Sequence, residues 1–313
     1  MHDVSSSALA HGGSVHTPLT TTRYASPKMS RRVALALILC APLAIAQTSG
    51  HDDGSEEGSE PLPSASASAS VPLHPVVAPH AITQKDGMVQ VAGGKFTMGT
   101  NDAKAAPNEK PAHEAHVATF WIDRTEVTVA AYRACVQTHK CEAPQRTAPT
   151  CTYDFGDDNL PVSCVRWQDA DAFCRAENKR LPSEYEWELA ARGGGAFKYP
   201  WGNSPSTCFQ AATLLRNETG RSCTGFKPAR VGSYVVNVSP FGAVDMAGNL
   251  EEWTATWYVE HLASGARPTS GASHVLRGGG WLSRPIDSRT TARNWGSSLE
   301  AGPNVGFRCA KDP

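Results

Sequence analysis

The sequence of 313 residues is poor in charge, in methionine and in long apolar segments. Charged residues make up 19% and the formal net charge is −1, so the basic excess that lets a protein bind nucleic acid is missing. Methionine occurs 5 times, whereas glycine occurs 27 times and proline 22 times, which favours a loop-rich domain over a helical bundle. No repeat of fixed period is present, which argues against a propeller or solenoid.

The longest apolar run, residues 33–45, is too short for a transmembrane helix of about 20 residues. Arg31 and Arg32 precede it and Ala-Ile-Ala at 44–46 closes it, an arrangement typical of a secretory signal peptide. We predict that residues 1–46 are this signal; a start at Met29 would give it an ordinary length. A lipoprotein anchor at Cys40 is an alternative, disfavoured because no small residue directly precedes the cysteine. The sequence thus predicts an exported protein, periplasmic or extracellular, with no transmembrane span.

The chain after the signal divides into a linker and one domain. Residues 47–85 are rich in serine, alanine, proline and acids, and they contain too few large apolar side chains to offset the entropy of ordering. We predict that this segment is disordered. The remaining 86–313, about 230 residues, is long enough to bury the core of one domain.

Cysteine is abundant for an exported chain: one of the nine lies in the signal and eight lie in the domain. No pair has the C-x-x-C spacing of zinc modules, so four disulfides are favoured over a metal cluster. Eight cysteines allow 105 connectivities, and this count alone does not choose among them.

Local patterns predict short elements. Alternating apolar residues predict strands at 88–91, 95–98 and 117–122. Thr128 can cap a helix through 129–135, and apolar spacing predicts another helix at about 167–178. Ser183 and Glu186 form a capping-box pattern for a helix that Gly193 can end. Glycine and proline recur beyond residue 199, where we expect no long helix.

These pieces, taken in order, resemble the formylglycine-generating enzyme family, also called sulfatase-modifying factors. The resemblance covers essentially the whole domain and implies an α+β fold that is a variant of the C-type lectin fold, stapled by disulfides and low in regular secondary structure. The matching stretches are MVQVAGGKFTMGT (88–100), DRTEVTVAAY (123–132), PVSCVRWQDADAFC (161–174), KRLPSEYEWELAARGG (179–194), YPWGN (199–203), FGAVDMAGNLEEWT (241–254), VLRGGGW (275–281) and NVGFRCA (304–310).

The resemblance also shows what is missing. Active members of the family use oxygen and a Cu(I) ion, held by two cysteine thiolates, to oxidise a sulfatase cysteine to formylglycine. In the run that matches their G-G-S-Y-x-C-x-x-x-x-C-R, this chain has Ser283 and Ser288 at both cysteine positions and Gly280 at the serine position. Glu251 replaces the tryptophan of their G-N-x-W-E-W run. A serine hydroxyl stays protonated and is a hard donor, so we expect no copper and no formylglycine generation.

Other family features are retained. The resemblance implies a disulfide between Cys174 and Cys309, and we expect Cys208 to pair with Cys223. The four cysteines between 135 and 164 are then expected to pair among themselves, in an order left open: Cys135, Cys141, Cys151 and Cys164.

A calcium site is also implied by the resemblance, because residues 245–252 match a family calcium loop. Its ligands would be the side chains of Asp245 and Glu252 and the backbone carbonyls of Gly248 and Leu250, which are hard oxygen donors.

Two further patterns carry little weight. His113 and His116 lack the H-E-x-x-H spacing of a metalloprotease helix. Ser283, Ser288, Asp287 and His274 lack the G-x-S-x-G elbow of a hydrolase.

The sequence therefore predicts a non-catalytic module that binds a peptide, a glycan or a partner protein outside the cytoplasm. An oxidoreductase with altered chemistry on the same scaffold is the alternative. We expect a polar acid/base cluster in the groove of an enzyme and an apolar floor in a binding module.

Overall fold

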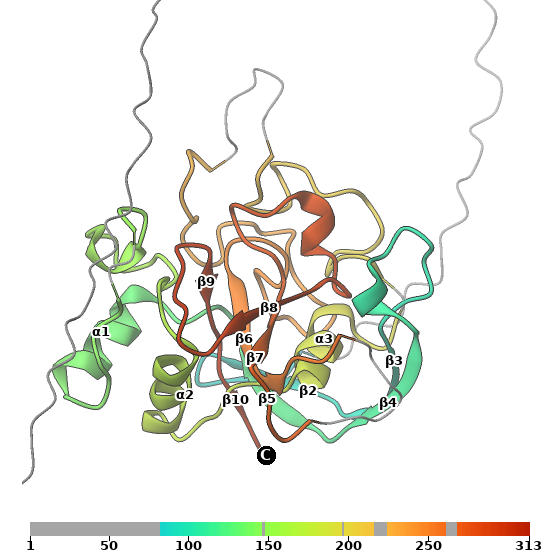
Figure 1. Ribbon diagram of the computed structural model, residues 1–313, viewed down its shortest axis with the longest axis horizontal. Helices are drawn as coiled ribbons and strands as arrows, with labels where there is room; N and C mark the ends of the chain where they lie inside the picture. Colours follow the sequence, from blue (N-terminus) through green and yellow to red (C-terminus); the bar gives the residue numbers. More distant parts are fainter. Residues whose placement is uncertain (1–81, 146–147, 196, 216–223, 261–267) are drawn as a thin grey trace, which may run out of the picture. The chain divides into compact units, whose positions relative to one another are not determined.

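The computed structural model describes residues 82–145, 148–195, 197–215, 224–260 and 268–313 (Figure 1). The predicted signal peptide, and the predicted linker up to residue 81, lie outside this part of the chain. Within it, no helix is long and apolar enough to cross a membrane. Strand β1 (Gln84–Lys85) is already paired, so ordered structure begins before residue 86.

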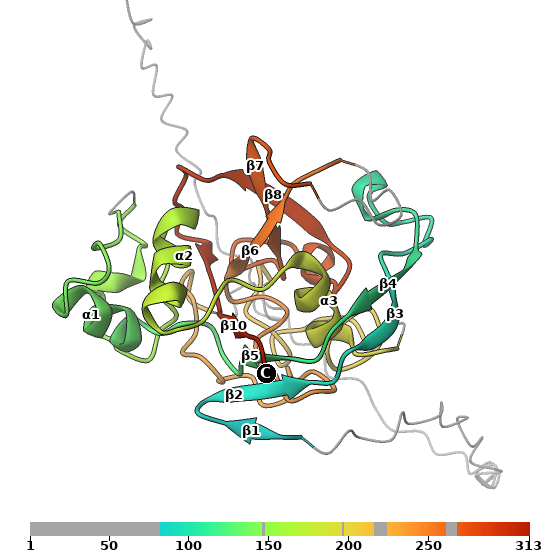
Figure 2. The same cartoon turned by 90° about the horizontal axis from the view of Figure 1, so that it is seen from below.

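The described strands form three small sheets. The first has the order β1, β2 (Met88–Val91), β5 (Phe120–Asp123) and β10 (Ala310–Lys311). Figure 2 shows the C-terminus of the chain next to β10 and β5. The second pairs β3 (Gly94–Met98) with β4 (His113–Val117). The third has the order β8 (Arg293–Ser297), β7 (Ser273–Arg277), β6 (Glu251–Trp257) and β9 (Val305–Gly306), with β6 and β9 parallel.

The strand predicted at 117–122 is wrong in its bounds, because Ala118 and Thr119 separate β4 from β5 and belong to neither strand. Gly93 explains the break: a Cβ there would lie 2.3 Å from the backbone nitrogen of Thr119. The Gly93 amide also donates to Thr119 Oγ1 at 3.1 Å. The connection at Ala118 and Thr119 therefore packs directly on this glycine, and the strands on either side enter different sheets.

The three α-helices begin where the local signals place them. Thr128 Oγ1 accepts from the Ala131 amide at the start of α1 (Val129–Gln137). Helix α2 covers Trp167–Ala176. Helix α3 (Glu184–Arg192) has the predicted capping box of Ser183 and Glu186, and Gly193 ends it with a φ of +65°. Three 3-10 turns complete the helical structure of the described residues: η1 (Pro107–Glu109), η2 (Thr152–Asp154) and η3 (Pro285–Ser288).

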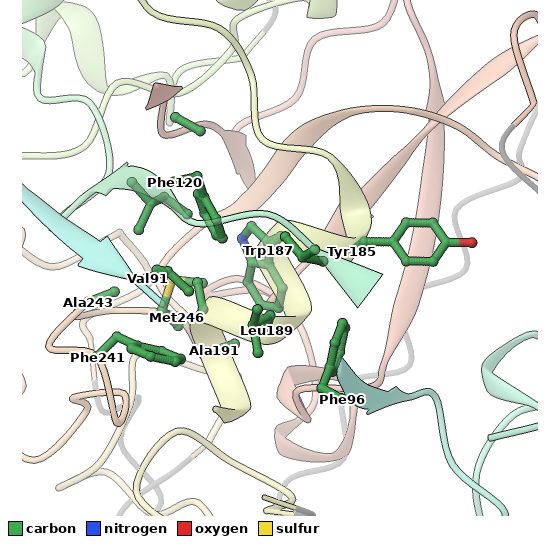
Figure 3. Packing of buried hydrophobic residues seen from close by; sticks show 14 of the residues in the cluster. Val91, Phe96, Phe120, Tyr185, Trp187, Leu189, Ala191, Phe241, Ala243 and Met246 are labelled. Carbon is green, nitrogen blue, oxygen red and sulfur yellow. The ribbon is translucent and has the colours of Figure 1, made fainter. Parts of the chain in front are cut away.

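Two large apolar clusters stabilise the domain. The first surrounds Trp187 of α3, which is fully buried and packs among residues of β2 to β5 and the loop at 241–246 (Figure 3). The second joins α1, α2 and the C-terminal residues Phe307 and Cys309. Its aromatic centre is Tyr132, whose ring stacks on Phe173 with centroids 5.5 Å apart. Both clusters combine elements that are distant in sequence. Contacts within the clusters therefore fix the positions of the connecting loops, although the helices are short.

Two of the three described disulfides, Cys135–Cys141 and Cys174–Cys309, lie within the second cluster. The structure contains Cys174–Cys309, the pair implied by the family resemblance. The four mid-chain cysteines pair among themselves, as Cys135–Cys141 and Cys151–Cys164. Cys208 is also disulfide-bonded, whereas Cys223, its expected partner, lies outside the described residues.

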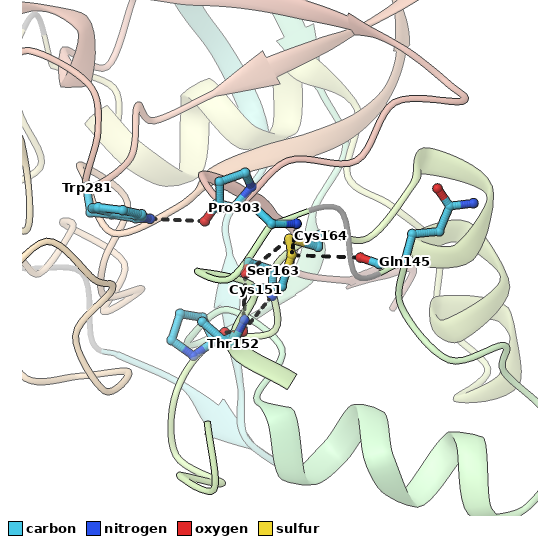
Figure 4. The surroundings of a disulfide bond; sticks show 9 residues. Gln145, Cys151, Thr152, Ser163, Cys164, Trp281 and Pro303 are labelled. Atoms are coloured by element: carbon cyan, nitrogen blue, oxygen red, sulfur yellow. Dashed lines mark hydrogen bonds between the residues drawn. A yellow bond between two sulfur atoms is a disulfide. The ribbon is translucent and has the colours of Figure 1, made fainter. Parts of the chain in front are cut away.

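The Cys151–Cys164 disulfide lies beside the segment at 302–304 (Figure 4). The Cys164 amide donates to the Gly302 carbonyl at 3.0 Å, and the Trp281 indole donates to the Pro303 carbonyl at 3.0 Å. These two bonds fix the segment that precedes β9.

Candidate functional site

A cleft of about 680 Å³ opens beside the glycine-rich segment that follows β7. Its wall combines this segment and η3 with the starts of β6 and β8 and with the 104–109 region. The residues that line the cleft are Lys104, Ala106, Glu109, Glu251, Leu276, Gly278, Gly279, Leu282, Ser283, Arg284, Ile286, Asp287, Arg289, Ala292, Arg293, Asn294 and Asn304.

Ser283, the first of the two positions at which the family resemblance implies a cysteine, lies on the cleft wall. Its Oγ accepts from the Gly280 amide at 3.0 Å and from Asn304 Nδ2 at 3.2 Å. Asn304 Oδ1 in turn accepts from the Leu282 amide at 2.9 Å. A Cβ on Gly280 would lie 2.3 Å from Asn304 Oδ1. Glycine at this position therefore lets the Asn304 side-chain amide contact residues 280–283.

Ser288, the second such position, is at the end of η3 and is fully buried. It is not among the residues that line the cleft, and its Oγ has no hydrogen-bond partner among the described residues. A Cβ on Gly279 would lie 2.8 Å from this Oγ, and Gly279 has a φ of +63° that disfavours other residues. The two serines therefore share one segment but differ in access: one faces the cleft and one lies beneath it.

Glu251 is the one buried carboxyl of the cleft that is held by amides alone. It begins β6, and its backbone amide donates to the Asn304 carbonyl at 2.8 Å, which places it beside that residue. Asn294 Nδ2 donates to Glu251 Oε1 at 2.9 Å. Burial raises the pKa of Glu251, while hydrogen bonds from the Asn294 and Asn304 side chains act in the opposite direction.

The other charges of the cleft are mostly paired. Arg289 holds Glu109 by two bonds of 2.7 and 2.8 Å. Burial opposes ionisation of Glu109, but Arg289 and the Thr291 hydroxyl outweigh it and lower the pKa of this carboxyl. Arg293 likewise holds Glu184 of α3, with Nε 2.6 Å from Oε1. At the exposed rim, Arg284 pairs with Asp287 at 2.9 Å.

The predicted calcium ligands lie in a second region, in a sharply turned loop. Asp245, Gly248 and Asn249 all have positive φ, of +59°, +81° and +71°. The Asp245 side chain accepts from the Gly232 amide through Oδ2, whereas its Oδ1 is buried without a partner. Glu252 accepts from both ends of the Arg308 guanidinium, at 2.7 and 2.6 Å, and from the Trp187 indole at 2.8 Å.

A third buried carboxyl, Glu126, adjoins this loop, and sequence patterns did not single it out. Its oxygens accept from Asn249 Nδ2 at 2.7 Å and from the Leu250 amide at 3.0 Å. Burial raises its pKa well above the ordinary value, and the neighbouring Asp245 and Glu252 raise it further. Burial likewise raises the pKa of Asp245 to about 6.

These three carboxyl groups share one fully buried guanidinium, Arg308. The loop thus has more buried carboxyl groups than buried cations. Asp245 Oδ1 has no hydrogen-bond partner in the described part of the chain, and it is a hard oxygen of the kind that coordinates calcium. No group of three or more His, Cys, Asp or Glu side chains that could hold a metal occurs in the described residues. The predicted set, however, has two such side chains and two carbonyls.

The two weaker sequence patterns form no site. The His274 ring lies between Trp167 and Trp257, with centroids 3.9 and 3.8 Å apart, and it does not line the cleft that contains Ser283. His113 and His116 are both on strand β4, three residues apart, so their side chains point to opposite faces.

The architecture defines a class: an α+β, C-type-lectin-like domain stapled by disulfides. The family described as the sulfatase-modifying factor enzyme 1-like domain matches residues 74–313, and the chain belongs to it.

Curated relatives include both inactive and active members. The chain is 30% identical over 281 residues to the inactive Cα-formylglycine-generating enzyme 2 of Mus musculus, covering 72% of this chain and 86% of that protein. It is also 30% identical over 280 residues to the formylglycine-generating enzyme of Mus musculus, covering 72% and 75%. Among solved structures, PvdO from Pseudomonas aeruginosa aligns with a TM-score of 0.61 and 28% identity, over 72% of this chain and 94% of that one.

Proposed function

We propose that this protein is an exported, non-catalytic member of the family, whose cleft binds a peptide, a glycan or a partner protein. The observation that carries the proposal is the state of the two replaced cysteine positions. The Ser283 hydroxyl is bound by Gly280 and Asn304, and the Ser288 hydroxyl is buried outside the cleft wall. Neither hydroxyl is a soft, ionised donor of the kind that Cu(I) selects.

A relative named as inactive supports this proposal, because it shows that the family includes non-catalytic members. Identity to the active mouse protein is the same, at 30%, so the proposal rests on the cleft and not on sequence identity. Export is supported by the disulfides, which persist in oxidising compartments. The class of ligand depends on the side chains that line the cleft.

One observation favours the alternative, an oxidoreductase with altered chemistry. The floor of the cleft is polar, and no aromatic side chain lines it among the described residues, so the apolar floor expected of a binding module is not found. The buried Glu251, whose pKa is raised, is the kind of group that serves in acid/base catalysis. The remaining acids of the wall are held in ion pairs, which favours binding over proton transfer.

Copper binding tests the proposal. The purified protein is titrated with Cu(I) against a coloured chelator, with Ser283→Cys/Ser288→Cys as the matched variant that restores both thiols. We expect the natural protein to leave Cu(I) on the chelator, because it offers no thiolate pair, and the double variant to remove more of it. Uptake of one Cu(I) per natural chain would contradict the proposal.

We also propose that the loop at 245–252 binds calcium through Asp245, Glu252 and the carbonyls of Gly248 and Leu250, with the charge of Glu126 behind them. The fit rests on the unpartnered Asp245 Oδ1 and on the excess of buried acid over base. Glu252 would share an oxygen between Arg308 and the ion. Calcium would supply positive charge to the loop and hold its turn.

Chelation tests the calcium site. An ion present at 100 times its dissociation constant stabilises a domain by about 2.7 kcal/mol, so EGTA is expected to lower the melting temperature by roughly 5–10 °C. Asp245→Ala should abolish this response, whereas Asp171→Ala, at a surface ion pair with Arg175, should keep it. An unchanged melting temperature in EGTA would show that the loop holds no calcium.

A further inference from the structure

One carboxyl group of the cleft, Glu251, has no cationic partner among the residues that the structure describes. Each of the other two acids on its wall has an arginine: Glu109 has Arg289, and Asp287 has Arg284. Glu251 Oε1 instead accepts from the uncharged side-chain amide of Asn294 at 2.9 Å, and the Glu251 backbone amide donates to the Asn304 carbonyl. Because Glu251 is only 9% exposed, its charge is largely withdrawn from water without a counterion.

The amides that hold Glu251 are themselves held, so the carboxyl is fixed in position. Asn304 is placed by the Leu282 amide through its Oδ1 and by its backbone bond to Glu251. Asn294 lies opposite Leu276 in the register of β7 and β8. A carboxyl oriented in this way by neighbouring residues is prepared for a specific contact. At this position the family resemblance implies a tryptophan, so the carboxyl group departs from the family pattern.

We propose that Glu251 is the specificity residue of the cleft and that it accepts a primary ammonium group, as carried by a lysine side chain. The inference rests on the proposed binding function, which it makes more specific. The ligand cation would pair with the Glu251 carboxyl group, which has no cationic partner of its own among the described residues.

The geometry favours ammonium over the other biological cations. A guanidinium binds a carboxylate best through both oxygens, but Asn294 already occupies Oε1 of Glu251. Quaternary ammonium groups are held by aromatic cages, and no aromatic side chain lines the described cleft. Leu282 and Ile286 are 41% and 43% exposed at the rim, where they can contact the aliphatic stem of a lysine.

The test uses four small probes on the full-length protein, with dissociation constants measured by ligand-observed NMR: the Nα-acetyl methylamides of lysine, Nε-acetyl-lysine, norleucine and arginine. We expect the lysine probe to bind at least about tenfold more tightly than the other three, because each of them removes or reshapes the ammonium donor. Equal binding of the norleucine or arginine probe would overturn the proposal.

Variants assign the effect to the residue. Glu251→Gln keeps the shape of the side chain and should weaken the lysine probe about tenfold or more while leaving the norleucine probe unchanged. Asp171→Asn, at an ion pair with Arg175 outside the cleft, should change neither by more than about twofold. The probe series on the natural protein decides the question even if Glu251→Gln fails to fold. If no probe binds, the ammonium inference fails, while the copper titration judges the non-catalytic function separately.

Discussion

Replacing Cys174 and Cys309 together by alanine is expected to lower the free energy of unfolding by about 5 kcal/mol. The disulfide closes a loop with a sequence separation of 135, so its loss restores much conformational freedom to the unfolded chain. It also joins α2 to the C-terminal residues inside the second apolar cluster, where both cysteines are fully buried. Urea denaturation of the oxidised natural protein and of the double variant measures the difference.

The matched control removes the shortest of the three described bridges. Cys135→Ala/Cys141→Ala opens a loop with a separation of 6, for which the same chain-entropy relation gives only about 2 kcal/mol. An equal loss in both double variants would show that loop entropy does not govern the effect, because the two bridges differ chiefly in loop length.

The second large effect is expected at Arg277, the fully buried arginine at the end of β7. Its Nη2 lies 2.5 Å from Glu188 of α3, and its two terminal nitrogens also donate to the carbonyls of Thr290, Thr291 and Ala292. Arg277→Met keeps the length of the side chain but leaves the three carbonyls and Glu188 Oε2 without this donor, while Glu188 Oε1 keeps its bond from Arg192 at 2.8 Å. Removing one member of a buried charged pair costs about 3–5 kcal/mol, and we expect a loss of that size.

A surface arginine gives the comparison. Arg284 forms a pair with Asp287 at the exposed rim, where water screens the charges, so Arg284→Met should leave the urea midpoint unchanged. If Arg277→Met also left the urea midpoint unchanged, the buried network between α3 and β7 would contribute little to the stability of the fold.

Local signals in the sequence predicted the helices well and the sheets less well. Helix α3 was predictable because Ser183 and Glu186 satisfy each other's neighbouring amides within one turn, without help from distant residues. The break between β4 and β5 was not, because apolar residues continue through the connection at Ala118. What ends the strand is contact with Gly93, more than twenty residues away. Such contacts leave no periodic trace.

The same distinction applies to the site. The resemblance identified Ser283 and Glu251, and the structure places both on the wall of one cleft. It did not identify Asn294 and Asn304, which hold Glu251, or Glu126, which adjoins the calcium loop. Asparagine and glutamate are common in loops for many reasons, so their type carried no signal. Their roles depend on strand register and long-range contacts, such as the bond from the Glu251 amide to the Asn304 carbonyl.

The most direct test of the central claim is turnover. The copper-treated protein is incubated under oxygen with a peptide that contains C-x-P-x-R, and the peptide is examined by mass spectrometry and by capture of aldehydes with a hydrazide probe. An active family member serves as the positive control. We predict that the peptide cysteine remains a thiol, because Ser283 and Ser288 supply no thiolate to Cu(I). Formation of a peptide aldehyde that depends on this protein would contradict the account.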